Sequence, residues 1–315
     1  MNKNIGGFIP WENWQLNCTP YHESATNLSS ARSALSYIIH NFKVKKIYTP
    51  SYICPEIVNL LNENVSDVIT YDIDDLFFPK LLPTLNKSEF FLYVNYFGIC
   101  RSNVLELKNI YNDKLIIDLS MAFFEKNYNL LSFNSCRKFF GTPDGAYMFG
   151  TNISSELEYN PLLSTRHLHL SNLNQDLAYK LFRVNENCIS SKIYNMSLIT
   201  QSVMKSIDYS MVMQTRIKNF NYLNDVLNIS NLLKINNLFD EVPLYYPYLP
   251  NFTIDRNVFH KSKIYTPKLW DNLKIYNNKS FSLFLVNKLI PLPIDQRYNN
   301  SDMDFILNIV KEKYT

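Results

Sequence analysis

Two charged residues stand in surroundings that favour chemistry, and the first is Asp118. It follows the apolar residues 115–117, which have the composition of a buried strand. A carboxylate at the end of a buried strand costs free energy unless a cation lies beside it. Open parallel sheets bind ligands at the carboxyl ends of their strands, so Asp118 is placed for ligand binding. The N-cap of a following helix is the alternative interpretation of this residue.

The second residue is Lys138, which lies between the pair 136–137 (Cys-Arg) and the phenylalanine pair 139–140. An amine flanked by aromatic rings and an adjacent cation can have a lowered pKa, as a Schiff-base lysine requires. The alternative is a basic turn between strands, with residues 143–145 as a β-turn. Residues 135–138 also fit the S-x-x-K pattern of penicillin-binding proteins and β-lactamases. Their S-D-N and K-T-G segments do not occur in this sequence, which argues against that class.

Both residues belong to a longer series of motifs. Asp118-x-x-Met121-Ala122 is followed by a strand that ends in Ser135. Directly after it comes the run Arg137-Lys138-Phe139-Phe140-Gly141-x-Pro143-Asp144-Gly145-Ala146. The other motifs are Gly6-Gly7-Phe8 with Trp11-Glu12, and residues 28–35, 47–54, 94–98 and 292–298. The ordered set resembles the DegT/DnrJ/EryC1/StrS sugar aminotransferases, and the resemblance covers nearly the whole chain.

Members of that family are fold type I enzymes that use pyridoxal 5′-phosphate. The resemblance implies that Lys138 forms the Schiff base with this cofactor and moves protons between cofactor and substrate. It implies that Asp118 pairs with the pyridinium nitrogen and keeps that nitrogen protonated. The helix that begins at Ala31-Arg32 would bind the cofactor phosphate through its amides, and Ser135 would add a hydroxyl donor.

The sequence departs from the family pattern at several of these positions. Met121 replaces the usual histidine or glutamine, and a thioether cannot donate a hydrogen bond. Ala31 replaces a glycine of the phosphate helix. The residue that stands over the cofactor ring is Cys54 by spacing, with Tyr52 as the alternative. Asn195 is the candidate for a residue that reaches the phosphate of a partner subunit.

The elements that must position these residues follow from the hydrophobic pattern. Apolar residues at helical spacing predict a helix over 29–42, and Pro55 suits the start of a second helix that extends to residue 61. Strands are predicted at residues 46–49, 68–71, 90–94, 115–118 and 130–133. Alternation of strands and helices predicts an α/β fold with a mostly parallel central sheet. The resemblance specifies it as a fold type I PLP-transferase fold.

The second half of the chain has a different pattern. Residues 168–233 have helical periodicity and no strong strand, residues 282–285 are predicted as a strand, and residues 303–311 as a closing helix. We therefore expect a large PLP-binding α/β domain over residues 1–220, which includes the helical connector. A small C-terminal α+β domain would follow over residues 221–315.

Composition narrows the classes of function. The chain has 315 residues, of which 46% are hydrophobic and 19% charged, a composition that fits a folded protein. Its net charge of +3 gives no support for nucleic-acid binding. No G-x-G-x-x-G and no phosphate-loop lysine pattern occurs. The five cysteines form no C-x-x-C pair, so neither a metal site nor a disulfide framework is expected. No signal peptide or membrane span is recognisable, so we expect a cytoplasmic protein without a membrane partner.

The resemblance implies an enzyme that moves an amino group from glutamate or glutamine to a nucleotide-linked keto-deoxysugar for surface polysaccharide biosynthesis. It also implies a homodimer, because the phosphate site is shared between subunits. Two alternatives remain open. One is a PLP-dependent sugar dehydratase, although such enzymes carry histidine where this chain has Lys138. The other is a cofactor-free homologue that serves as a binding protein, which Met121, Ala31 and Cys54 motivate. The sequence does not specify the sugar, the nucleotide or the aminated carbon.

Overall fold

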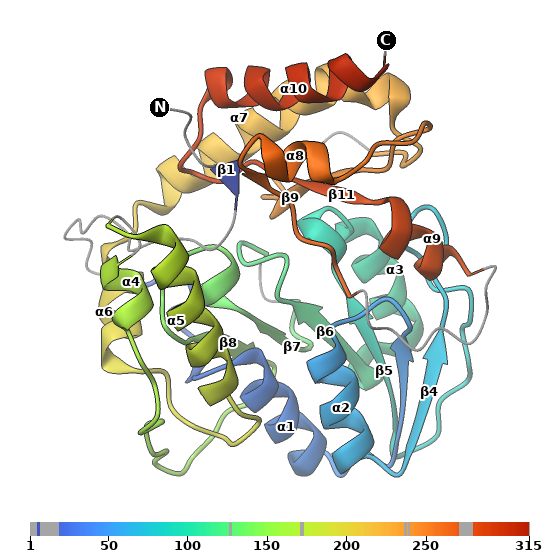
Figure 1. Ribbon diagram of the computed structural model, residues 1–315. Coiled ribbons are helices and arrows are strands. Elements are labelled where there is room, and N and C mark those ends of the chain that lie inside the picture. The colour runs from blue at the N-terminus through green and yellow to red at the C-terminus, as the bar shows by residue number, and fades with distance from the viewer. Residues whose placement is uncertain are drawn as a thin grey trace.

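A seven-stranded sheet lies at the centre of the larger part of the molecule (Figure 1). The structure is a computed structural model that describes residues 5–6, 19–125, 128–170, 173–235, 238, 240–270 and 280–314. The strand order is β2-β8-β7-β6-β5-β3-β4. Pairing is parallel from β4 through β7 and antiparallel at β8 and β2, which confirms the predicted α/β class with a mostly parallel sheet. The strands are β2 (Thr26–Leu28), β3 (Lys46–Pro50), β4 (Asp67–Tyr71), β5 (Glu89–Val94), β6 (Leu115–Leu119), β7 (Leu131–Asn134) and β8 (Ala146–Phe149).

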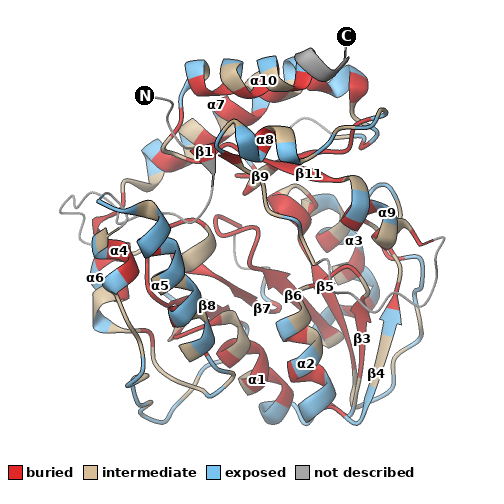
Figure 2. Ribbon diagram, in the orientation of Figure 1, coloured by how far each residue is buried: buried red, intermediate tan, exposed pale blue. Residues whose placement is uncertain are grey.

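Helices cover both faces of this sheet. They are α1 (Ala31–Asn41), α2 (Pro55–Asn64) and α3 (Arg101–Tyr111). The β3–α2–β4 and β5–α3–β6 units run in opposite directions across the sheet, so right-handed crossovers place α2 and α3 on opposite faces. Residues 90–94 of β5 and all of β6 are buried, as Figure 2 shows in red, which confirms a strand buried on both faces at 90–94.

The helices predicted between residues 168 and 233 are present. They are α4 (Arg166–Leu170), α5 (Gln175–Cys188), α6 (Leu198–Ser206) and α7 (Tyr209–Leu227). Helix α7 continues across the boundary that we propose between residues 220 and 221. Short 3₁₀ helices occur at η1 (Tyr96–Gly98), η2 (Asn112–Lys114), η3 (Cys136–Lys138) and η4 (Asn228–Ser230).

A second hydrophobic core forms where α7 meets the C-terminal part of the chain. The antiparallel strands β9 (Tyr245–Tyr248) and β11 (Ile290–Pro293) lie beside α7 and α10 (Asn300–Tyr314), as Figure 1 shows at the top of the molecule. Strand β1 (Ile5–Gly6) pairs in parallel with β10 (Ile264–Tyr265), next to α8 (Asn257–Lys261). The rest of the N-terminal motif, Gly7, Phe8, Trp11 and Glu12, lies outside the described residues.

The strand predicted at residues 282–285 is wrong, because this segment belongs to helix α9 (Phe281–Lys288). Ser280 caps the helix by accepting a hydrogen bond of 3.2 Å from the Leu283 amide. Asp72, which follows β4, accepts hydrogen bonds from the Phe281 amide at 3.0 Å and from the Ser282 amide at 3.1 Å. Capping by a distant carboxylate therefore outweighs the strand tendency of a short apolar run. In the described part of the chain, no helix is long and apolar enough to cross a membrane.

Candidate active site

Asp118 lies near the carboxyl end of β6, at the centre of the sheet. In the register it is paired with Val94 of β5 and with Phe133 of β7. Only 6% of its surface is exposed, and its Oδ1 accepts a hydrogen bond of 2.7 Å from the Ser120 amide. No helix begins between residues 120 and 125, so Asp118 is not a helix cap.

The Asp118 carboxylate is buried and has no ion-pair partner among the described residues. Burial raises the pKa of its carboxyl, although the positive charge of Lys138 and the hydrogen bond from Ser120 oppose the shift. Among the described residues, no lysine, arginine or histidine forms an ion pair with this carboxylate. A cationic ligand group beside Asp118 would therefore stabilise its ionised form.

Lys138 ends the single turn η3, which follows β7. The Cys136 amide donates a hydrogen bond of 3.0 Å to the Gly145 carbonyl, and the Gly145 amide donates one of 2.7 Å to the Ser29 carbonyl. Gly145 has a φ of +114°, and a Cβ there would lie 2.8 Å from Cγ2 of Thr200. Only glycine fits this position without strain. The turn with Lys138 is thereby fixed beside the chain that enters α1.

Residues 143–145, the β-turn of the alternative interpretation, are all buried. The Asp144 carboxylate accepts hydrogen bonds from the Ser197 amide at 2.9 Å and from the Ser197 hydroxyl at 2.6 Å. The Pro143 carbonyl accepts one of 3.0 Å from the Asn185 side chain. This loop connects the lysine turn to helices α5 and α6.

The amino end of α1 is built from serines. Ser30 is the N-cap, and its hydroxyl accepts a hydrogen bond of 3.0 Å from the Ser33 amide. The Ser33 hydroxyl donates to the Lys192 carbonyl at 2.7 Å, which fixes the segment near residue 192 against the helix. The first amides of a helix have no acceptor within it, so those of Ala31 and Arg32 are available to an anion.

Four side chains from α1, α2 and the lysine turn influence one another. The Cys54 thiol donates a hydrogen bond of 2.7 Å to the Glu56 carboxylate. Burial raises the pKa of Cys54 to about 12, against the positive charge of Lys138. Burial also lowers the pKa of the Arg32 guanidinium, which the negative charge of Glu56 opposes. Cys54 and Arg32 are therefore brought to the same site as Lys138.

Tyr52 has a different environment. It is fully buried, its ring centre lies 4.4 Å from that of Trp270, and it stacks on Tyr96 at 5.8 Å. The Tyr96 hydroxyl donates a hydrogen bond of 2.8 Å to the Tyr52 carbonyl. Tyr52 is thus part of an aromatic cluster in the core, whereas Cys54 is half-buried beside charged groups.

The remaining predicted site residues lie around this centre. Met121 and Ser135 are both buried, and Ser135 occupies the N-cap position of η3. Asn195 is half-buried, and its backbone bridges to Leu28, two residues before the N-cap of α1. Its amide donates a hydrogen bond of 2.8 Å to the Glu158 carbonyl.

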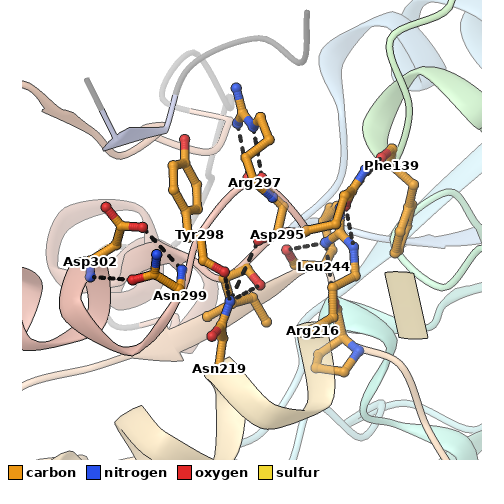
Figure 3. Close-up of polar contacts among 12 residues, drawn as sticks. Phe139, Arg216, Asn219, Leu244, Asp295, Arg297, Tyr298, Asn299 and Asp302 are labelled. Carbon is orange, nitrogen blue, oxygen red and sulfur yellow. Dashed lines mark hydrogen bonds and ion pairs between the residues drawn. The ribbon is translucent and has the colours of Figure 1, made fainter. Parts of the chain in front are cut away.

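Arg216 of α7 and Gln296 contact the lysine turn. Arg216 was not anticipated from the sequence, and Gln296 was named only as part of the motif at residues 292–298. Arg216 is fully buried, and both side chains donate hydrogen bonds to the Phe139 carbonyl, next to Lys138 (Figure 3). Arg216 lies among the buried positions of α7, which also include Val212 and Phe220. A charged residue within the apolar stripe of a helix is the sequence signal that could have identified it.

Arg137, the neighbour of Lys138, is also held by the helical region. Its guanidinium forms an ion pair with Glu186 of α5 and lies 5.8 Å from the centre of the Phe182 ring. Burial lowers the pKa of Arg137 to about 10, and the positive charge of Arg32 adds to this effect. Arg32 and Arg137 therefore contribute positive charge to the same end of α1.

Comparisons with known proteins give similarity in structure only. No protein-family model matches the chain, and no curated protein matches it. One similar solved structure is PseC from Helicobacter pylori, an aminotransferase involved in the biosynthesis of pseudoaminic acid. It has 15% sequence identity to this chain and a TM-score of 0.66, and the alignment covers 98% of this chain and 99% of that chain. The aminotransferase TlmJ from Streptoalloteichus hindustanus has 12% identity and a TM-score of 0.66, with 98% of both chains covered.

A third similar structure is the PLP-form of Spr1654 from Streptococcus pneumoniae, a protein that has been assigned as a sugar aminotransferase. It has 12% identity and a TM-score of 0.64, with 97% of both chains covered. All three alignments span the sheet, the helical region and the C-terminal part of this chain together. The chain therefore has the fold of the sugar aminotransferases over nearly its whole length.

Proposed function

We propose that this protein is a pyridoxal-phosphate-dependent aminotransferase that acts on a nucleotide-linked keto-deoxysugar. One observation carries the proposal. The chain of hydrogen bonds from Ser29 through Gly145 to Cys136 holds the open amides of α1 beside the turn of Lys138, and the charge of Lys138 acts on the buried Asp118. An anion site, an amine and a buried carboxylate are thus gathered at the carboxyl ends of β6 and β7, where such sheets bind ligands.

The residues present fit pyridoxal phosphate. The cationic ring nitrogen would supply the partner that the buried Asp118 lacks among the described residues. The amides of Ala31 and Arg32, the Arg32 guanidinium and the Ser135 hydroxyl would bind the phosphate. When bound, this cofactor supplies an electron sink that stabilises negative charge at the substrate carbon.

The chain's own groups then have separate tasks. The Lys138 amine would bind the cofactor and move a proton to and from the substrate carbon. Asp118 would hold the proton on the ring nitrogen. Cys54, rather than the core residue Tyr52, would border the ring, because Cys54 lies within the electrostatic reach of Lys138. Buried Met121 would make the contact near the ring apolar.

The substrate class rests on the structural neighbours. PseC functions in the biosynthesis of pseudoaminic acid, and Spr1654 has been solved in forms with PLP and PMP. By the sequence resemblance we assign glutamate or glutamine as the amino donor and a role in surface polysaccharide biosynthesis in the cytoplasm. Domains over residues 1–220 and 221–315 belong to the same proposal.

A homodimer is also part of the proposal. Large apolar side chains are exposed on α5 and at the start of α6, which supports a protein contact in this region. They are Leu177, Tyr179, Val184 and Leu198. In such a dimer Asn195 would reach the phosphate site of the partner. Light scattering on the purified protein measures the mass of the particle directly, and a monomer at micromolar concentration would contradict this part of the proposal.

The experiment that tests the function compares wild type with Lys138→Ala and with Lys180→Ala, which changes an exposed lysine of α5. Purified proteins are incubated with pyridoxal phosphate, reduced with borohydride and digested. We expect the cofactor mass on the peptide with Lys138 in wild type and in Lys180→Ala, and on no peptide of Lys138→Ala. Amino-sugar formation from a panel of nucleotide keto-sugars should follow the same pattern. Stable labelling of Lys138 without transfer to any sugar would contradict the assigned substrate class, and no labelling would favour the cofactor-free binding protein.

A further inference from the structure

Arg216 is a cation that the interior of the protein encloses completely. It lies on α7 with 0% of its surface exposed. Burial of a guanidinium is costly unless its donors are hydrogen-bonded. The identity of its acceptors therefore indicates why the charge is there.

The acceptors of Arg216 come from three distant parts of the chain (Figure 3). Its Nε donates to Oε1 of Gln296 at 3.1 Å, and its Nη1 donates to the Leu244 carbonyl at 3.1 Å. Its Nη2 donates to the Phe139 carbonyl at 3.4 Å. Nε2 of Gln296 donates to that same carbonyl at 2.9 Å. Two side chains from outside the large sheet thus converge on one carbonyl oxygen.

Arg216 holds the side chain of Phe139 as well. The guanidinium carbon lies 4.5 Å from the centre of the Phe139 ring, which is a cation–π distance. Phe139 is therefore fixed at both its carbonyl and its ring. Because Phe139 is fixed at two points, the backbone of the preceding residue, Lys138, has little freedom to move.

The lysine turn is consequently held from both ends. At its start, the Cys136 amide donates to the Gly145 carbonyl. At its end, Arg216 and Gln296 fix Phe139. The Lys138 side chain has four rotatable methylene groups, so the position of its amine depends on a fixed backbone. An error of about 1 Å in the position of a reacting group can cost about a hundredfold in rate.

We propose that Arg216 and Gln296 are positioning residues for Lys138, which they hold through the Phe139 carbonyl. This inference rests on the proposed function, in which Lys138 is the catalytic amine. Lysine cannot replace Arg216, because a single ammonium group cannot reach the acceptors that the planar guanidinium spans. Because Gln296 belongs to the C-terminal part of the chain, the position of the lysine turn also depends on how that part packs against it.

The test compares Arg216→Lys and Gln296→Met with a matched control, Asn219→Ala. Asn219 lies on the same buried face of α7 and donates to the carbonyls of Ile294 at 3.2 Å and Tyr298 at 3.0 Å, so it joins α7 to the segment that contains Gln296. It makes no hydrogen bond to Phe139 in the described structure. Gln296→Met keeps Arg216 and a similar side-chain volume, so it remains informative if Arg216→Lys does not fold.

With the holoenzyme, we expect Arg216→Lys and Gln296→Met to lower kcat by about tenfold to a hundredfold, with KM changed by less than about threefold. The pH midpoint of the visible absorption of the lysine-bound cofactor should shift in both. Asn219→Ala should lower the melting temperature while kcat and the pH midpoint stay at the wild-type values. An equal loss of kcat in all three variants would reduce Arg216 to a general stabilising residue and overturn the inference.

A measurement without cofactor separates this inference from the proposed function. The amine of Lys138 is labelled with an acylating reagent in cofactor-free protein, and the labelling rate is read by mass spectrometry. We expect a change of at least about twofold in Arg216→Lys and Gln296→Met and none in Asn219→Ala. An unchanged rate in both variants contradicts the positioning role even if Lys138 proves to be the catalytic amine. A changed rate in a protein that never binds pyridoxal phosphate would instead refute the proposed function alone.

Discussion

The amide of Gly145 donates a hydrogen bond of 2.7 Å to the carbonyl of Ser29. This bond joins the loop after the lysine turn to the residue that precedes the N-cap of α1. It brings the two ends of the proposed cofactor site together, since the phosphate would lie at α1 and the reactive amine at Lys138. The backbone distance between α1 and the lysine turn is therefore set by the loop between β7 and β8.

Gly145→Ala should disrupt this connection. A Cβ at a φ of +114°, 2.8 Å from Cγ2 of Thr200, forces the loop to move. We expect a loss of about 1–3 kcal/mol in the free energy of unfolding and a lower affinity for pyridoxal phosphate. Urea unfolding of the cofactor-free protein and titration with the cofactor measure the two effects.

Gly150→Ala is the control for that variant. Gly150 has a φ of +79°, and a Cβ would lie 2.5 Å from the Leu130 carbonyl oxygen, but it follows the opposite end of β8. It should lose stability and keep its cofactor affinity. If both variants bind the cofactor equally well, the loop of Gly145 does not set the geometry of the site.

Asp118→Asn tests the buried carboxylate through the pH dependence of stability. Burial raises the pKa of Asp118 in the folded, cofactor-free protein above its ordinary value of 3.8. The folded state therefore binds the proton more tightly than the unfolded state, and stability is lost as the pH rises from 3.8 through the folded pKa. Removal of the charge should abolish that loss.

We expect cofactor-free Asp118→Asn to be at least as stable as wild type at pH 7, with the difference vanishing below about pH 4. Amino transfer by the same variant should fall by about a hundredfold or more, because the ring nitrogen would lose its anionic partner. Urea unfolding between pH 3.5 and 8 and steady-state kinetics measure these opposite effects. A variant that is less stable at pH 7 and equally active would remove Asp118 from both roles.

The sequence predicts the sheet well, because the sheet depends on short apolar runs. The rule for ligand sites in parallel sheets applies to Asp118, whereas its grouping with Lys138 in one site is implied by the family resemblance. The sequence does not predict structural features that depend on contacts with residues far away along the chain. Helix α9 depends on the Asp72 carboxylate, and the burial of Arg216 depends on carbonyl oxygens of Phe139 and Leu244. No local pattern contains these partners, so single-sequence reasoning cannot find them.

Cys54, which spacing favours for the place over the cofactor ring, and the alternative Tyr52 differ in accessibility, because Tyr52 is fully buried and Cys54 is half-buried. Cys54 is half-buried near Lys138, so bound cofactor should cover it. We expect pyridoxal phosphate to slow the alkylation of Cys54 by at least about threefold at pH 9, where some thiolate is present despite a pKa raised to about 12. Mass spectrometry of alkylated peptides measures the rate. Cys188 of α5, also half-buried, is the internal control and should react at the same rate with and without cofactor. Equal protection of both thiols would indicate a global effect and not a contact with the ring.

Asp72→Ala should weaken the attachment of α9 to the large sheet. Asp72 accepts hydrogen bonds from the Phe281 and Ser282 amides, and a further bond of 2.6 Å from the Ser282 hydroxyl. Its removal should cost about 0.5–2 kcal/mol, as loss of a helix cap does. Burial opposes ionisation of Asp72, but hydrogen bonds from Ser282 and Lys80 outweigh burial and lower its pKa.

A lowered folded pKa means that this stabilisation is present above the ordinary value of 3.8 and is lost as the pH falls through the folded pKa. The free energy of unfolding of Asp72→Ala should therefore differ from that of wild type at pH 7, and the difference should shrink as the pH falls below 3.8. Asp67→Ala is the matched control, because Asp67 begins the edge strand β4, directly after which Asp72 lies. The Asp67 side chain is 55% exposed and pairs only with Lys46, at 3.3 Å, among the described ion pairs. An exposed pair of this kind contributes about 0–1 kcal/mol, so Asp67→Ala should change stability less. Equal losses in the two variants, or a difference between Asp72→Ala and wild type that does not shrink as the pH falls below 3.8, would show that the carboxylate does not cap α9 in solution.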